Sequence, residues 1–361
     1  MTKTLSLNAL SLNRLGVSVG IPLAAVLLAL ALGALLVLAI GVPVGEALAA
    51  FADGAWGSDY AIAASINRAL AFSLVGFGFV LAARANLTNV GGEGQIAVGG
   101  MLATAMSLYG GAAQLPGPLA WIAPLAVAAL GGALWGALAG VLKAKAGTNE
   151  VISTLLLSFI AVWLLYWSVQ SEALLRQPMN NSATLPESLE IPELTRLPLL
   201  TGDAGFPLHV GLPIAIVLAL VVAVVLARSV FGFQLRAVGL NPVAARKAGI
   251  PLTRSIVAAM ALAGALGGLA GGFMLQGDQY VLKAGFSSGY GFDGLVVGLL
   301  ARGSIPGVIA GALLFGFMRS GGINLEMSAN VPTALVGVIQ GLIILLLAAA
   351  AFWIERKESA R

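Results

Sequence analysis

Several polar residues stand inside or beside long apolar stretches of this sequence, and they are its candidates for chemistry. They are Asn89, Glu93, Gln95, Asn149 and Asp293. Carboxylates near hydrocarbon are costly and normally face the protein interior or an aqueous cavity. One interpretation is that these groups line a path for a hydrogen-bonding solute. The other is that they cap helix ends and hold broken helices together, as Asn149 and Glu150 would at a helix start.

A second candidate is the polar segment 231–250, which carries Arg236, Arg246 and Lys247. Asn241 followed by Pro242 is a helix-start signal, residues 243–248 suit a short helix, and Gly249 is a natural C-terminal stop. The segment is too polar to insert into a bilayer. It is either a basic connection between two spans or a helix that docks into a groove of a cytoplasmic partner.

The composition places these residues in a membrane protein. Of 361 residues, 59% are hydrophobic and 9% are charged, and the mean hydropathy is +0.98, a balance that excludes a water-soluble fold. The sequence has no cysteine, so it holds no disulfide, thiolate nucleophile or iron-sulfur site. A single histidine, His209, makes no proton relay, and we expect no metal site and no cofactor.

The apolar blocks predict an all-α, polytopic membrane helix bundle of about ten crossings. Its expected parts are a cytoplasmic N-terminal segment (1–14), a transmembrane domain (15–354) and a cytoplasmic tail (355–361). The transmembrane domain is expected to contain one long extracytoplasmic loop (172–208) and one cytoplasmic loop (228–254). The block 15–45 is interpreted as a retained first span rather than a cleaved signal peptide, because it is long and lacks an evident cleavage site.

Two features predict discontinuous helices. The apolar piece 294–301 is too short to cross, and Gly303 and Pro306 separate it from 305–317, which suggests a discontinuous or re-entrant pair. The segments 91–99 and 290–298 also share a glycine-rich opening, an acidic residue and a final Val-Gly. They are either inverted repeats that enter from opposite sides or a chance match in a glycine-rich protein.

Lysine and arginine are retained on the cytoplasmic side of short loops. In the layout above, one side carries most of the cations, and the other carries mainly Arg176, Arg196 and Lys283 among many acids. We therefore expect both termini in the cytoplasm.

Four motifs resemble a known family. Residues 236–250 resemble the coupling-loop signature of permease subunits in the branched-chain amino acid, ribose and nucleoside class of ABC importers. Residues 86–95 look like the Asn-Ile-Gly-x-Glu-Gly-Gln element of that class, and 148–154 and 291–294 match further motifs. Val90-Gly91 replaces the preferred Ile-Gly, and Ser158 stands where asparagine is common. The chain is most similar to the larger permease of general nucleoside (simple sugar) uptake systems.

The resemblance implies a type II-like importer permease of the bacterial inner membrane. It implies as partners an ATP-binding subunit, a second homologous permease in a heterodimer, and an extracytoplasmic solute-binding protein that docks over the loops around 46–60, 172–208 and 277–290. ATP and Mg²⁺ would bind the ATPase, since this chain has no phosphate-binding loop motif. The residues implied in ATPase coupling are Arg236, Asn241, Pro242, Ala244, Ala245, Arg246, Lys247 and Gly249.

The order of expected substrates is nucleosides, then simple sugars, then branched-chain amino acids. A different class stays open, an ion-coupled secondary transporter in which Glu93 or Asp293 carries the coupling proton. A membrane scaffold without transport activity is disfavoured, because it does not need buried acids and broken helices. ATP-dependent uptake with added partner subunits would distinguish the first class from the second.

Overall fold

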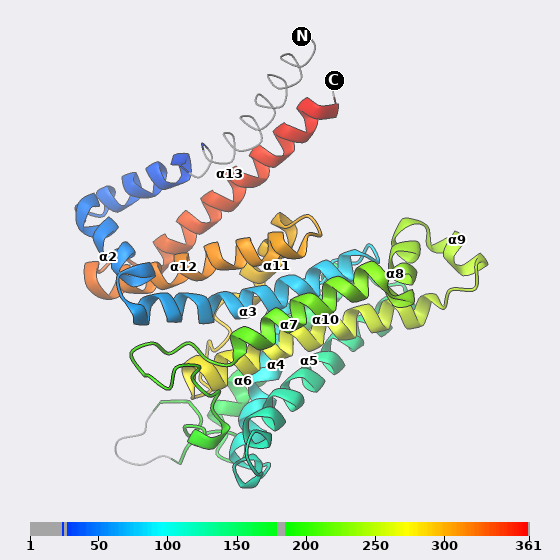
Figure 1. Cartoon of the computed structure of the whole chain (residues 1–361), viewed down its shortest axis with the longest axis horizontal. Helices are drawn as coiled ribbons and strands as arrows, with labels where there is room; N and C mark the ends of the chain where they lie inside the picture. Colours follow the sequence, from blue (N-terminus) through cyan, green and yellow to red (C-terminus); the bar gives the residue numbers. More distant parts are fainter. Residues whose placement is uncertain (1–23, 25–26, 179–184, 360–361) are drawn as a thin grey trace. The chain divides into compact units, whose positions relative to one another are not determined.

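The computed structural model describes Ala24, residues 27–178 and residues 185–359, and these ranges are helical, without β-strands. After a helix Leu27–Ala39, the main helices are α2 Val44–Trp56, α3 Asp59–Ala83, α4 Gly92–Leu108, α5 Leu119–Ala146, α6 Glu150–Gln170, α7 Gly211–Arg228, α8 Val230–Leu240, α9 Pro242–Lys247, α10 Leu252–Met274, α11 Tyr290–Leu300, α12 Ile305–Ala329 and α13 Thr333–Ser359 (Figure 1). The expected all-α, polytopic fold is confirmed. The N-terminal segment 1–14 lies outside the described residues.

Six of the described helices, α3, α5, α6, α7, α10 with the π-turn after it, and α12, are long and apolar enough to cross a bilayer. The count is up to seven if the bent pair formed by Leu27–Ala39 and α2 is one span. Two segments predicted to contribute crossings are shorter: α4 has 17 residues and α11 has 11. At 1.5 Å per residue, α11 covers only about half of a 30 Å hydrocarbon layer.

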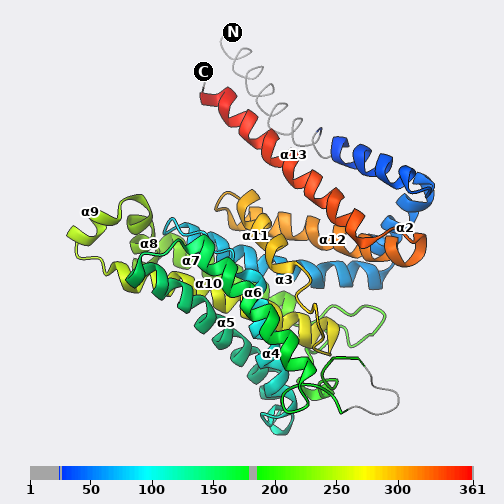
Figure 2. The same cartoon turned by 180° about the vertical axis from the view of Figure 1, so that it is seen from behind.

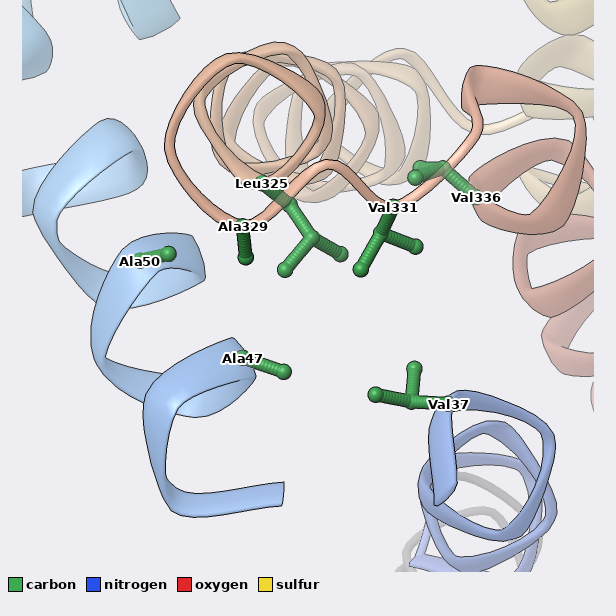
Figure 3. Close-up of a cluster of buried hydrophobic side chains, with 7 residues drawn as sticks. All are labelled: Val37, Ala47, Ala50, Leu325, Ala329, Val331 and Val336. Atoms are coloured by element: carbon green, nitrogen blue, oxygen red, sulfur yellow. The ribbon is translucent and has the colours of Figure 1, made fainter. Parts of the chain in front are cut away.

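The chain forms two compact units. One contains the described parts of Met1–Ala61 and Met318–Arg361, and the other is Ile62–Phe317. In the first unit, the chain turns at Gly41, where φ is +86°, and the two helices flanking this turn are bent by 119°. Small and branched side chains fill the space between the helices of this unit. They are Val37, Ala47, Ala50, Leu325, Ala329, Val331 and Val336 (Figure 3).

Two expectations about this unit are corrected. The region 46–60 was expected to be a loop but is mostly helical, because α2 extends to Trp56 and α3 begins at Asp59. The predicted apolar segment 305–317 continues as helix α12 to Ala329, a length of 25 residues. Leu325 and Ala329 pack against α2, so tertiary burial extends the helix beyond its most apolar part. The short half of the predicted pair is therefore α11 alone.

In the unit Ile62–Phe317, helices α4, α5 and α10 pack without a layer of side chains between them. A Cβ at Gly132 of α5 would overlap the backbone of Gly264 and Gly268 in α10. A Cβ at Gly99 of α4 would overlap Gly268 from the other side. Small residues allow this close approach, which maximises van der Waals contact where lipid offers no hydrophobic driving force. The three helices form the centre on which the other helices are arranged.

The connections of this unit lie at two opposite ends of the bundle. Short helix α9 projects at one end, and the segment after α6 lies at the other, as both views show (Figures 1 and 2). The α9 end contains the links 84–91, 147–149, 229–251 and 301–304. The opposite end contains 109–118, 171–178, 185–210 and 275–289.

Candidate functional site

The starts of α4 and α11 meet inside the second unit. A Cβ at Gly291 would overlap the backbone of Gly92 and Glu93, and a Cβ at Gly92 would lie 3.0 Å from the carbonyl oxygen of Gly291. Only glycine permits two backbones to approach this closely. The two glycine-rich segments compared in the sequence are therefore neighbours in the structure. Each one opens a helix, with Gly91 and Gly289 as the residues before the first turn.

Glu93 joins the two helix starts. Its Oε1 accepts a hydrogen bond from the Gly289 amide at 2.9 Å, and its Oε2 accepts one from the Gly291 amide at 2.8 Å. The residue is only 6% exposed. Helix N-termini carry unsatisfied amides and a partial positive charge, and here two of them converge. A carboxylate at this point satisfies the amides of α11 and balances the charge of both helix ends.

Asn89 and Gln95 form the next layer of this junction. Each side-chain amide donates to the other's oxygen at 3.2 Å, and Asn89 Oδ1 also accepts from the Gly91 amide at 2.9 Å. Two hydroxyls of α6 complete the layer: Thr154 accepts from the Val90 amide at 3.2 Å, and Ser158 accepts from the Gly94 amide at 3.3 Å. Two hydroxyls of α6 thus hold the segment 89–95 in place by accepting hydrogen bonds from its backbone amides.

The structure places the other two pathway candidates apart from this layer. Asp293 lies in the first turn of α11 and is partly buried. Asn149 is exposed and caps α6, with its Oδ1 accepting from the Val151 amide at 2.9 Å. Sequence reasoning did not single out Thr154 and Ser158 as members of the site. Their spacing of four residues within an apolar helix was the available signal, because it places both hydroxyls on one face.

The junction lies between the two ends of the bundle. Phe286 packs beside Gly100, two turns along α4 from Glu93. After α11, the Gly303 carbonyl accepts a bond of 2.7 Å from Arg84, which follows the end of α3. The segment before α11 therefore runs beside α4 toward Glu93, and from there the chain continues as α11 to the α9 end. Because α4 runs the other way from Glu93, both helices start inside the bundle, where the surrounding protein allows a helix to begin at membrane depth.

Helix α9 forms as the sequence predicts. Asn241 Oδ1 accepts from the Val243 and Ala244 amides, both at 3.0 Å, and Pro242 occupies the first turn. The helix runs to Lys247, and Gly249 has a φ of +80°, which favours glycine at a helix end. The Asn-Pro start and the glycine stop are both confirmed.

Helix α9 exposes most of its surface. Ala245 alone among its six residues is buried, while Leu240 before it and Val243 within it are 88% and 65% exposed. Ala244, Arg246 and Lys247 are also exposed. Arg236 is different, because it lies in α8 and its guanidinium donates to the Leu226 carbonyl. The exposed helix thus presents apolar, small and basic groups together, a combination suited to a protein partner.

At the opposite end, the long segment after α6 is tied to the chain that follows α10. Main-chain amides of Ser188, Ile191 and Leu197 donate to carbonyls of Leu282, Tyr280 and Gln276, at distances of 2.8, 3.0 and 2.8 Å. Gln276 is fully buried and also donates to the carbonyls of Trp121 and Thr195. Arg196 lies over the Tyr280 ring at 4.6 Å and pairs with Glu190 at 2.9 Å. These bonds hold 185–210 as an ordered cover over the end of α10.

His209 belongs to this cover. The ring is 1% exposed, its Nδ1 accepts from the Gly211 amide at 3.1 Å, and it packs edge-on against Phe273. Burial disfavours the charged imidazolium and lowers the pKa of His209 to about 4. The histidine is therefore a neutral acceptor at the start of α7.

Comparison with known proteins identifies relatives across nearly the whole chain. The family described as "Branched-chain amino acid transport system / permease component" matches residues 61–348. The guanosine ABC transporter permease protein NupP of Bacillus subtilis is 32% identical over 91% of this chain and 93% of its own. The nucleoside ABC transporter permease protein NupB of Lactococcus lactis is 29% identical over 91% and 90%.

A third relative is the glucose ABC transporter permease protein TsgB13 of Haloferax volcanii, which is 32% identical over 92% of this chain and 88% of its own. No solved structure matches the chain significantly. The family match covers the junction at Glu93 as well as the exposed helix α9. Together with the membrane-spanning helices, these similarities show that the chain belongs to the ABC importer permease family of the branched-chain amino acid transport type.

Proposed function

We propose that this chain is the permease subunit that carries nucleosides through an ABC importer. The observation that carries the proposal is α9, a short, capped, exposed helix at one end of a bundle of this family. An ATPase that closes on nucleotide needs such a contact to transmit its movement to the membrane helices. ATP and Mg²⁺ bind the ATPase subunit, and this chain contributes no catalytic group.

The cations support a cytoplasmic position for the α9 end. Those at the α9 end are Arg84, Lys143, Lys145, Arg228, Arg236, Arg246, Lys247, Arg254 and Arg302. The described cations toward the opposite end are Arg68, whose neighbour Asn67 donates to the Pro207 carbonyl, and Arg176, Arg196 and Lys283. The positive-inside rule then places α9 in the cytosol and the cover 185–210 outside, where a solute-binding protein would dock. As the sequence leads us to expect, we propose the inner membrane of a bacterium as the location, with both termini in the cytosol.

Nucleosides are favoured as substrate because two relatives that match 91% of this chain are named for guanosine or nucleosides. Glucose is the second candidate, from the similarity to TsgB13. A heterodimer of permeases is favoured because Bacillus subtilis, Lactococcus lactis and Haloferax volcanii each have two relatives of this chain. This chain matches NupP at 32% identity and NupQ at 25%, so it takes the place of the former.

The role of the junction follows from its bonding. Glu93, Asn89 and Gln95 direct their polar atoms to one another and to backbone amides. We assign them the task of holding α4 and α11 together along the translocation route. Alternating access would then move these half-helices relative to the bundle.

The test is uptake of labelled guanosine into proteoliposomes that contain this chain, a second permease and the ATPase, with the binding protein added outside. We expect uptake to require ATP and to be competed by unlabelled nucleosides more strongly than by glucose or leucine. Uptake by this chain alone, driven by a pH gradient, would overturn the proposal in favour of a secondary transporter.

The same preparation tests α9. We expect the double variant Arg246→Glu plus Lys247→Glu to lower guanosine uptake per ATP hydrolysed about tenfold, the effect of losing about 1.4 kcal/mol of docking energy. Lys145→Glu is the matched control, since Lys145 is exposed at the same end but lies in α5. Normal coupling in the double variant, at normal abundance in the membrane, would remove α9 from the proposal.

A further inference from the structure

A basic cavity of about 350 Å³ opens at the α9 end of the second unit. Its polar wall is formed by Arg84, Arg236, Gly303 and Ser304, and its apolar wall by Ala223, Leu226, Ala227, Ile305 and Pro306. The lining includes two arginines and no acidic residue. Its size is within the range of small-ligand sites.

Three helices place this cavity at the boundary between lipid and water. Arg84 follows the end of α3, Ala227 is in the last turn of α7, and Ile305 begins α12. The two helices that supply Ala227 and Arg236 also carry exposed apolar side chains, Val224 in α7 and Val230 and Phe233 in α8, with 56%, 73% and 59% of their surface accessible. These residues suit a position against lipid at the level of the headgroups.

A second, apolar cavity of about 180 Å³ lies between the same three helices. Its lining includes Leu70 and Phe77 of α3, Ala219 of α7 and Ile309 of α12, with Ser73 as its single polar residue. Ala219 is one helical turn from Ala223 of the basic cavity, and Ile309 is one turn from Ile305. The apolar cavity therefore starts about 6 Å from the basic one along these helices, toward the middle of the membrane.

The two arginines keep hydrogen-bonding capacity for a ligand. A guanidinium has five N–H donors. Arg84 uses one on the Gly303 carbonyl at 2.7 Å, and Arg236 uses one on the Leu226 carbonyl. In the described residues, neither arginine is paired with a carboxylate. Two guanidinium groups, one from the turn after α3 and one from α8, therefore share one cavity whose lining has no negative charge to balance them.

We propose that these adjoining cavities bind one anionic phospholipid. Its phosphate would lie between Arg84 and Arg236, and one acyl chain would lie in the apolar cavity between α3, α7 and α12. Arginine is suited to phosphate because its planar fork donates two parallel bonds. Basic pockets between membrane helices on the cytoplasmic side recognise anionic headgroups in this way. A zwitterionic lipid is disfavoured, because its cationic amine would face the same two arginines.

The test measures lipid binding to the full chain by native mass spectrometry in detergent, with phosphatidylglycerol and phosphatidylcholine of the same acyl chains as probes. We expect phosphatidylglycerol to bind at least tenfold more tightly. The double variant Arg84→Gln plus Arg236→Gln should lose this preference, while Lys145→Gln, which removes an exposed cation outside the cavity, should retain it. Equal preference in all three proteins would overturn the proposal.

Two measurements on the unchanged chain make the test independent of how well the variant folds. Raising NaCl from 50 to 500 mM should weaken phosphatidylglycerol binding severalfold and leave phosphatidylcholine binding nearly unchanged, because salt screens the headgroup contact. Inorganic phosphate at 10 mM should displace less than half of the bound phosphatidylglycerol, because it lacks an acyl chain. Full displacement would assign the cavity to free phosphate, and an absent salt effect would exclude the arginines as the contact; either would overturn the lipid site.

Discussion

Helices α9 and α11 obtain hydrogen-bond acceptors for the amides at their starts in different ways. Each begins with backbone amides that have no partner within the helix. In α9, Asn241 supplies the acceptor from the position immediately before the helix. In α11, the acceptor is Glu93, which is 196 and 198 residues away from the two amides that it binds. A local cap lets α9 form as an exposed, nearly independent element, whereas α11 depends on the assembled bundle.

The start of α7 is intermediate between α9 and α11 in how far its acceptor depends on tertiary structure. His209 is local, since it accepts from the Gly211 amide two residues later. It is also buried against Phe273 of α10, so it acts only when the cover over the bundle is formed. The three helix starts therefore differ in how far each one depends on tertiary structure, and substitution of each acceptor measures that dependence.

The largest effect is expected at Glu93. Glu93→Gln leaves at least one buried amide facing another donor, and we expect it to lower the free energy of unfolding by roughly 2–4 kcal/mol. Guanosine uptake should fall with it. Thermal unfolding in detergent measures the loss, and hydrogen exchange at Gly289 and Gly291 localises it.

Two further variants sharpen this result. Glu93→Asp keeps the charge but is one methylene shorter, so it should give an intermediate loss with one amide still protected. Glu172→Gln removes an equal charge from an exposed position and should change little. If Glu93→Gln unfolded at the same temperature as Glu172→Gln, the link between α4 and α11 would carry no stability.

The second effect is the pH dependence contributed by His209. Its pKa of about 4 in the folded chain is below the ordinary value of 6.5, so the unfolded chain binds more protons between these values. The stabilisation is fully present above pH 6.5 and is lost as the pH falls toward 4. The full shift corresponds to about 3 kcal/mol.

His209→Asn keeps an acceptor for the Gly211 amide but does not titrate. We expect the unfolding temperature of this variant to fall less between pH 6.5 and pH 4 than that of the unchanged chain. The sequence has no other histidine, so the difference between the two proteins isolates this group. Identical pH profiles would show that His209 is not the titrating residue.

The smallest effect is expected at Asn241. Asn241→Ala removes the local cap of α9 at a cost of about 1 kcal/mol, which should speed hydrogen exchange at Val243 and Ala244 about fivefold. Asn241→Asp keeps the acceptor and should leave exchange slow. The global unfolding temperature should change little, because α9 is exposed. A large drop in that temperature would contradict the contrast between α9 and α11.

The same contrast explains how much could be predicted from the sequence. Helix α9, its Asn-Pro start and its glycine stop were predicted because every signal lies within nine residues. The division of the run 95–142 into α4 and α5 was also predicted from the intervening glycines and prolines. Glu93, Asn89 and Gln95 were recognised as polar groups in an apolar setting, but their partners were not. No local sequence pattern predicts that Glu93 accepts a hydrogen bond from the Gly289 amide. Nor does one predict that Thr154 and Ser158 accept hydrogen bonds from the segment 89–95.

Helix lengths show the same limit. The hydropathy of α12 falls after Phe317, which suggested a short segment, yet packing against α2 continues the helix to Ala329. The region 46–60 carries acids and polar residues typical of a loop, and it is mostly helical for the same reason. Tertiary burial overrides local composition in both cases.

The distance in sequence between Glu93 and its partners has a consequence for biogenesis. A ribosome that adds 5–20 residues per second needs about 10 to 40 s to synthesise the 196 residues that separate Glu93 from Gly289. During that interval, helices α5, α6, α7 and α10 emerge while the carboxylate still lacks both of the amides that donate to it. The nascent chain must therefore keep this acid hydrated or shielded by the insertion machinery until the segment that hydrogen-bonds to it arrives.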